Sequence, residues 1–179
     1  MSAYSVHLGL LLLTSFVLVR AESNRIVKLR KFKKVHEDEN SFQSSVELGE
    51  PDDEGHIKLS GEIATQVTLD NDWKVNITLY RKASEDDKYG TFMDLPVIGS
   101  CDLMSTYYKD FFYEKLKDYS NAPHPDDCPL APQKFHLKDY PINSSQLGKF
   151  LQAGDYRVVG QLVKDEELKL EYLAEFQVE

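Results

Sequence analysis

The chain has 179 residues, of which 30 are acidic and 21 are Lys or Arg, so its formal net charge at neutral pH is −9. This acidity argues against nucleic acid as a partner, because surfaces that bind phosphate backbones are normally basic. The length fits a single domain whose core is large enough to fold without many cross-links.

Residues 1–21 have the pattern of a secretory signal peptide. They contain an apolar run that ends at Val19, followed by Ala21, a small residue at which signal peptidase can cut. The run is shorter than the roughly 20 residues needed to cross a bilayer, and no later segment is comparably apolar, so we expect no membrane span. The sequence therefore predicts a secreted, extracellular protein with one domain, residues 22–179.

A basic stretch, RIVKLRKFKK, occupies residues 25–34, near the expected start of the mature chain. It fits an exposed strand that is attracted to the acidic remainder of the chain. It also fits a surface that meets anionic lipid headgroups. The exposed strand is the preferred interpretation, because runs of charge are usually exposed faces.

Alternation of apolar and polar residues with period two predicts strands in the first half of the chain. Residues 57–69 alternate over a long run, with one face suited to a core and one to solvent. Residues 73–82 alternate again after a polar turn, and here Val75, Ile77 and Leu79 share one face.

Two Asn-X-Ser/Thr sequons begin at Asn76 and Asn143. Asn76 falls on the polar face of its predicted strand, so that a glycan attached there would point to solvent. We expect surface glycans at both positions, because the chain is expected to be exported.

The C-terminal region predicts a hairpin of two strands, at 154–163 and 169–179, around a polar turn. In the last strand the apolar face comprises Leu168, Leu170, Tyr172, Ala174, Phe176 and Val178. Weaker alternation predicts two further strands, at 41–48 and 135–143.

One segment, residues 102–119, departs from period two. Its apolar residues recur at spacings of three and four without Gly or Pro, and Pro123 follows, which predicts an amphipathic helix. Several strands with one helix predict a mainly β protein: a two-sheet antiparallel sandwich with a helical crossover.

The stretch HPDDCPLAP, residues 124–132, contains one of only two cysteines in the chain. The other, Cys101, immediately precedes the predicted helix. In an oxidising compartment an even pair of cysteines is most simply a disulfide. We therefore expect Cys101 and Cys128 to be joined, which would clamp the helix to the sheet.

Two other uses of this stretch remain open. A metal site would recruit His124, Asp126, Asp127 and His136, but these residues match no structural zinc pattern. A thiol nucleophile would need a reduced cysteine, which exported chains rarely keep. The common hydrolase, zinc-protease and phosphate-binding motifs are also missing, which favours a binding protein over an enzyme, with no metal or cofactor expected.

The order of several short motifs resembles a known family. These motifs are a V-x-I-x-L strand at 75–79, a segment at 96–103 that leads into the aromatic helix, Cys-Pro-Leu at 128–130, FHLKDYPI at 135–142 and GDYR at 154–157. In their order they resemble small secreted insect proteins of the MD-2-related lipid-recognition type, which include CheB-like chemosensory proteins and relatives of the ganglioside-activator protein.

The resemblance implies an immunoglobulin-like sandwich whose sheets enclose an apolar cavity. It implies a secreted, non-enzymatic protein that binds a lipid or other hydrophobic ligand in chemosensory or innate immune recognition, with a cell-surface receptor as a further partner. The residues expected to line the cavity are Ile57, Leu59, Ile63, Val67, Val75, Ile77, Leu79, Met104, Tyr108, Phe111, Phe112, Tyr172 and Phe176. The alternative is an extracellular protein-interaction module with a closed core, because periodicity alone does not separate a packed core from a cavity wall.

Overall fold

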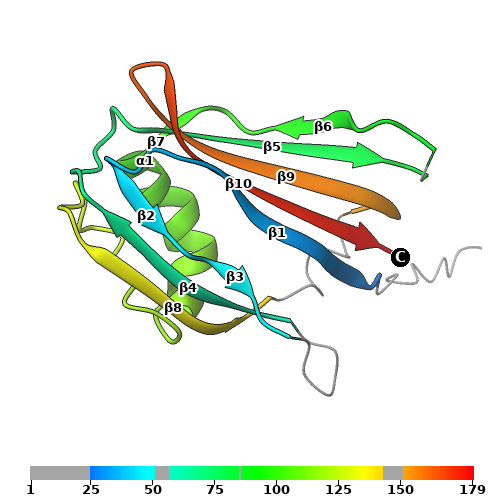
Figure 1. Cartoon of the computed structure of the whole chain (residues 1–179), viewed down its shortest axis with the longest axis horizontal. Helices are drawn as coiled ribbons and strands as arrows, with labels where there is room; N and C mark the ends of the chain where they lie inside the picture. The colour runs from blue at the N-terminus through cyan, green and yellow to red at the C-terminus, as the bar shows by residue number, and fades with distance from the viewer. Residues whose placement is uncertain (1–24, 51–56, 85, 143–150) are drawn as a thin grey trace, which may run out of the picture.

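The computed structural model describes residues 25–50, 57–84, 86–142 and 151–179 (Figure 1). These described residues are mainly β, with two antiparallel sheets and one helix, which confirms the predicted sandwich with a helical crossover. The predicted signal peptide and the Asn143 sequon lie outside the described residues. Within those ranges, none of the helical segments is both long and apolar enough to cross a membrane.

The larger sheet, sheet A, takes strands from both ends of the chain. Its order is β1-β10-β9-β5-β6, and the short β7 also pairs with β5. The bounds are Val27–Glu37 for β1, Lys74–Lys82 for β5, Gly90–Asp94 for β6, Ile98–Gly99 for β7, Gly154–Lys164 for β9 and Glu167–Val178 for β10. Val27 pairs with Val178 and Glu37 with Leu170, so β1 and β10 are neighbours over their whole length.

The smaller sheet, sheet B, is built around β4 (Lys58–Thr65). On one side β4 pairs with β2 (Phe42–Ser44) and β3 (Glu47–Leu48), and on the other with β8 (Lys134–Pro141). The strand predicted over 57–69 thus ends earlier than expected. Leu69 instead forms an isolated bridge with Leu130.

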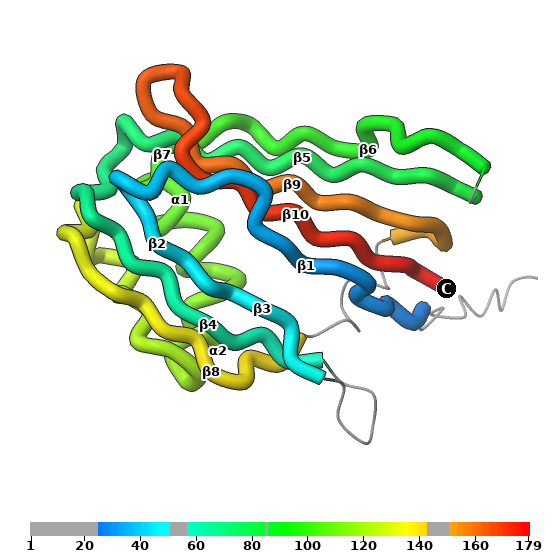
Figure 2. The backbone as a smooth tube through the Cα atoms, in the orientation of Figure 1, coloured from blue at the N-terminus to red at the C-terminus, as the bar shows by residue number. Residues whose placement is uncertain are grey.

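The two sheets meet where β1 leads into β2, and Figure 2 shows the backbone passing from one sheet to the other at this point. The side chain of Asp38 holds the turn, because its carboxylate accepts a hydrogen bond from the Ser41 hydroxyl at 2.7 Å. The basic stretch 25–34 therefore lies mostly in β1, an exposed strand, and Lys28 pairs with Glu179 at 2.6 Å.

One continuous helix connects the sheets, and Figure 1 shows it behind β2 and β4. It comprises α1 (Ser100–Leu103), η1 (Met104–Tyr113) and α2 (Glu114–Leu116). The helix begins two residues before the predicted range 102–119 and ends three residues before its end. Its central part is π-helical, a rare geometry that frequently occurs at functional sites.

Two clusters of buried side chains hold the layers together. Core 1 comprises Phe42, Leu69, Trp73, Met104 and Leu130, and core 2 comprises Leu151, Tyr156, Phe176 and Val178. In core 1 the rings of Phe42 and Trp73 meet edge to face, with centroids 5.6 Å apart. Core 1 thus joins the two sheets to the first turn of the helix, whereas core 2 belongs mainly to sheet A.

Candidate functional site

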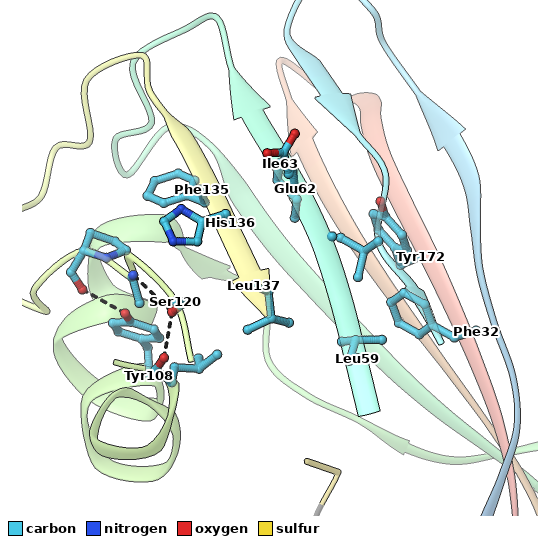
Figure 3. A pocket seen from close by; sticks show the side chains of 15 residues that line it. Phe32, Leu59, Glu62, Ile63, Tyr108, Ser120, Phe135, His136, Leu137 and Tyr172 are labelled. Carbon is cyan, nitrogen blue, oxygen red and sulfur yellow. Dashed lines mark hydrogen bonds between the residues drawn. The ribbon is translucent and has the colours of Figure 1, made fainter. Parts of the chain in front are cut away.

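Between the sheets and the helix lies a space of about 470 Å³, named cavity 1 (Figure 3). Its apolar lining comprises Phe32, Val46, Leu59, Ile63, Tyr108, Leu116, Ala122, Pro123, Phe135, Leu137 and Tyr172. Figure 3 shows Phe32 and Tyr172 on one side and Tyr108 on the other. Packed protein interiors contain few voids larger than a water molecule, so a space of this size is not a packing defect.

Tyr172 of β10 contributes a fixed aromatic wall to cavity 1. Its ring stacks on Phe32 of β1, with centroids 5.2 Å apart. Its hydroxyl donates to Ser44 Oγ at 2.6 Å, and the Ser44 hydroxyl in turn donates to the carboxylate of Glu37. Lys34 also donates to that carboxylate, at 2.6 Å. The hydroxyl of Tyr172 therefore already has a hydrogen-bond partner near the β1–β2 turn. Only its aromatic ring faces the cavity.

Tyr108 of η1 forms the facing wall. Its hydroxyl donates to the carbonyl of Pro123 at 2.8 Å. Burial raises the pKa of Tyr108 to about 12, and the nearby Tyr113 and Asp127 add to the effect. The phenol therefore remains a neutral donor under physiological conditions, and it too presents an apolar ring to the cavity.

A bend in β4 shapes the floor of cavity 1. The register against β8 shifts between Leu59 and Gly61, and such bulges bend a strand. Gly61 has a φ of +149°, and a side chain there would collide with the backbone of Ser45 and Val46. Glycine is thus required at this position, because it lets the link between β2 and β3 lie directly against β4.

A second space of about 440 Å³, named cavity 2, lies between another face of the helix and sheet A. Its lining comprises Val75, Ile77, Leu95, Pro96, Ile98, Leu103, Tyr107, Phe111, Phe112 and Val158. The face of sheet A that bears these residues and the wall of cavity 1 is named the inner face. Cavity 2 therefore shares both the helix and the inner face of sheet A with cavity 1.

Several large apolar side chains around cavity 2 are exposed. Phe111 is 71% exposed, Phe112 51% and Tyr107 46%, and Val97 in the adjoining segment is 62% exposed. These aromatic residues therefore do not fill a core between helix and sheet. They form an open rim, which a bound apolar molecule would cover.

The stretch at residues 124–132 is one end of a cross-link. Cys101 and Cys128 form a disulfide with their Cα atoms 5.4 Å apart, which confirms the predicted pairing. His124 and Asp127 form a local turn, in which the Asp127 carboxylate accepts a hydrogen bond from the backbone N–H of His124 at 3.0 Å. Among the described residues, no group of three or more His, Cys, Asp or Glu side chains could hold a metal ion.

All but one of the residues predicted to line a single cavity fall into three groups. Cavity 1 takes Leu59, Ile63, Tyr108 and Tyr172, and cavity 2 takes Val75, Ile77, Phe111 and Phe112. Met104 and Phe176 belong to the two cores, against which Val67 and Leu79 pack. The remaining residue, Ile57, is half-buried immediately before β4, and its carbonyl accepts a hydrogen bond from the backbone N–H of Ile142 at 3.3 Å.

Some residues that line the two cavities were not predicted from the sequence. Phe135 and Leu137 could have been predicted as lining residues, because they alternate with polar residues in β8 and share one face. Phe32 lies after a register shift in β1, which interrupts the alternation. Leu95 and Pro96 lie in an irregular segment without periodicity, so no pattern indicates their role.

Asn76 lies on the outer face of sheet A, opposite to the cavities, and is half-buried. Its amide donates to Gln161 at 3.1 Å, and Gln161 donates to Glu171 at 2.7 Å. A glycan on Asn76 would therefore project away from both cavities.

Residues 75–158 match the model of a family described as "Protein of unknown function (DUF1091)". The similarity is to a family without an assigned function. The matched segment runs from β5 into β9, and it includes the whole helix, both cysteines and β8. It leaves out β1 to β4 and β10, which supply much of cavity 1. No curated protein matches the chain.

Proposed function

We propose that this protein is a secreted, non-enzymatic carrier of a lipid or other hydrophobic small molecule, which it holds in cavity 1. The observation that carries the proposal is the cavity itself: about 470 Å³ between two sheets and a helix, with an almost wholly apolar lining. Small-molecule sites commonly have volumes of about 300–1,000 Å³ and are lined mainly by apolar and aromatic side chains.

The walls restrict the chemistry of the ligand. The hydroxyls of Tyr108 and Tyr172 already donate to Pro123 and Ser44, so they are not free to select a polar group. The buried part of the ligand is therefore apolar. Its affinity comes from burial, which contributes about 25 cal/mol per Å² of apolar surface removed from water before the cost of ordering.

Secretion and a relationship to the MD-2-related lipid-recognition type are part of the proposal. The disulfide is compatible with an oxidising compartment. A helix that lines one cavity together with both antiparallel sheets is compatible with the resemblance, because a helix at one edge of a sandwich can keep the sheets from packing about 10 Å apart face to face. A role in chemosensory or innate immune recognition follows from the resemblance alone.

The test is native mass spectrometry of the full chain secreted from a eukaryotic host, after deglycosylation, together with uptake of a fluorescent fatty acid. We expect lipid-sized adducts and saturable dye uptake. Leu59→Trp, which fills cavity 1, should weaken uptake by about tenfold or more. The matched control is Leu173→Trp on the outer face of sheet A, between Tyr172 and Ala174, which should leave uptake unchanged.

A different outcome would reject the proposal. If the secreted wild-type protein carries no adduct and takes up no dye, cavity 1 is not a lipid site. An extracellular protein-interaction module would then be the better description, and the exposed aromatic residues beside cavity 2 would be the first surface to test.

A further inference from the structure

A row of paired residues runs across sheet A from the lining of cavity 1 to the lining of cavity 2. Tyr172 of β10 lies opposite Gly160 of β9, which lies opposite Ile77 of β5. Directly paired residues of antiparallel strands point to the same face of a sheet. Tyr172 lines cavity 1 and Ile77 lines cavity 2, so Gly160 lies on the inner face between the two cavities.

The adjacent row has the same arrangement. Phe32 of β1 lies opposite Ala174 of β10, which lies opposite Val158 of β9. Phe32 lines cavity 1 and Val158 lines cavity 2. The residue between the two cavities is thus Gly160 in the first row and Ala174 in the second, and glycine and alanine are the two smallest amino acids.

The space above Gly160 is open. A Cβ atom built on Gly160 would meet no other atom within 4 Å, and the φ of Gly160 is outside the range that favours glycine. The backbone therefore does not require glycine here, although glycine weakens a strand interior. A glycine in the middle of a strand often marks a place where a ligand approaches closely, which agrees with the two flanking cavities.

We propose that cavities 1 and 2 are the two ends of one groove, which crosses the inner face of sheet A over Gly160 and Ala174 and holds a single long aliphatic chain. This inference rests on the proposed function and specifies its ligand class. Tyr172 and Ile77 lie two strands apart, or about 10 Å. An extended chain spans that distance, whereas a short or compact apolar molecule occupies one cavity alone.

The test compares the binding of octanoic, dodecanoic and octadecanoic acid to the full-length secreted protein, below their critical micelle concentrations. Wild-type affinity should continue to rise from dodecanoic to octadecanoic acid. Gly160→Leu should close the passage, weakening octadecanoic acid by about tenfold or more and changing octanoic acid by less than about twofold. Ala174→Leu is a second variant, which blocks the adjacent row from another strand.

Gly90→Leu is the matched control, because Gly90 lies in the edge strand β6 and a Cβ there also meets no atom within 4 Å. It should leave the whole series unchanged. A second measurement needs no variant. Octadecanoic acid that carries a spin label near its methyl end, and separately near its carboxyl end, should broaden methyl signals of Leu137 and Ile77 selectively, one in each cavity.

The outcomes separate the two proposals. If wild-type protein binds no acid of the series, the proposed function fails. If it binds them but gains nothing beyond dodecanoic acid, or if Gly160→Leu weakens short and long acids equally, the carrier function stands and the continuous groove is wrong. Spin labels that both affect only one cavity would also overturn the groove.

Discussion

Two neighbouring rows of residues on the inner face of sheet A differ in whether the space above their central residue is filled. The first row comprises Leu170, Leu162 and Val75, and the second comprises Tyr172, Gly160 and Ile77. In the first, Leu162 and Leu170 pack against core 1, where Trp73 and Phe42 fill the space between the sheets. In the second, the middle residue has no side chain and the space above it is open.

The contrast shows what decides between a packed core and a cavity in this fold. Both rows take one residue from each of β10, β9 and β5, and in both rows these residues point to the inner face. Strand alternation alone therefore does not distinguish the two rows. The difference is the volume at the central position, which is a leucine in one row and a glycine in the other. The glycine thus leaves open the space that Leu162 fills in the first row, whose end residue Val75 still lines cavity 2.

The disulfide holds the helix to the filled end, so removing it should have the largest effect. We expect Cys101→Ser with Cys128→Ser to lower the free energy of unfolding by about 3–4 kcal/mol, because the cross-link closes a loop with a sequence separation of 27. Urea unfolding measures this change. A loss below about 1 kcal/mol would mean that core 1 fixes the helix without the cross-link.

A matched pair of leucines compares the two ends directly. Leu130→Ala in core 1, where the side chain is 8% exposed, should cost about 3 kcal/mol. Leu137→Ala in cavity 1 should cost only about 1 kcal/mol, because part of its surface already faces a void. Thermal unfolding of the ligand-free proteins measures both, and equal losses would show that cavity 1 is collapsed in solution.

Tyr108→Phe removes the hydrogen bond to Pro123 and should lower stability by about 1 kcal/mol at neutral pH. Burial raises the pKa of Tyr108 from 10.0 to about 12, because the phenolate is disfavoured in the folded state. The contribution of this group is complete below pH 10 and is lost between pH 10 and about 12, as the unfolded chain ionises first. Urea unfolding across this range should show a smaller alkaline loss in the variant than in the wild type.

Gly160→Ala should have the smallest effect and the opposite sign. Alanine restricts the unfolded chain and meets nothing within 4 Å, so stability should rise by about 0.5–1 kcal/mol. Differential scanning calorimetry measures the shift. A clear loss of stability would show that the space above Gly160 is occupied by the protein itself.

Much of the fold was predictable because alternation is a strong signal where one face is buried. β5, β9 and β10 agree with their predicted strands to within a few residues, and Cys101 and Cys128 are joined as expected. β6 was not predicted, because all five of its residues are exposed and an edge strand without a buried face has no alternation.

The site was less predictable than the fold. Alternation indicates that Tyr172 and Phe176 share a face, but not that one lines a cavity and the other fills core 2. Phe111 and Tyr108 were expected in one lining, yet they face different cavities because the helix has two apolar faces. Gly160 was missed because its contribution is the lack of a side chain, which no hydrophobic pattern records.

The pairing of β1 with β10 also has a consequence for biosynthesis. Val27 is opposite Val178, so β1 pairs with a strand far along the sequence. Such distant pairing makes folding slow, because the intervening chain must be ordered before the contact forms. While the chain is being synthesised, the backbone of β1 lacks its pairing partner until β10 has emerged. Removing β10 would therefore also unpair β1.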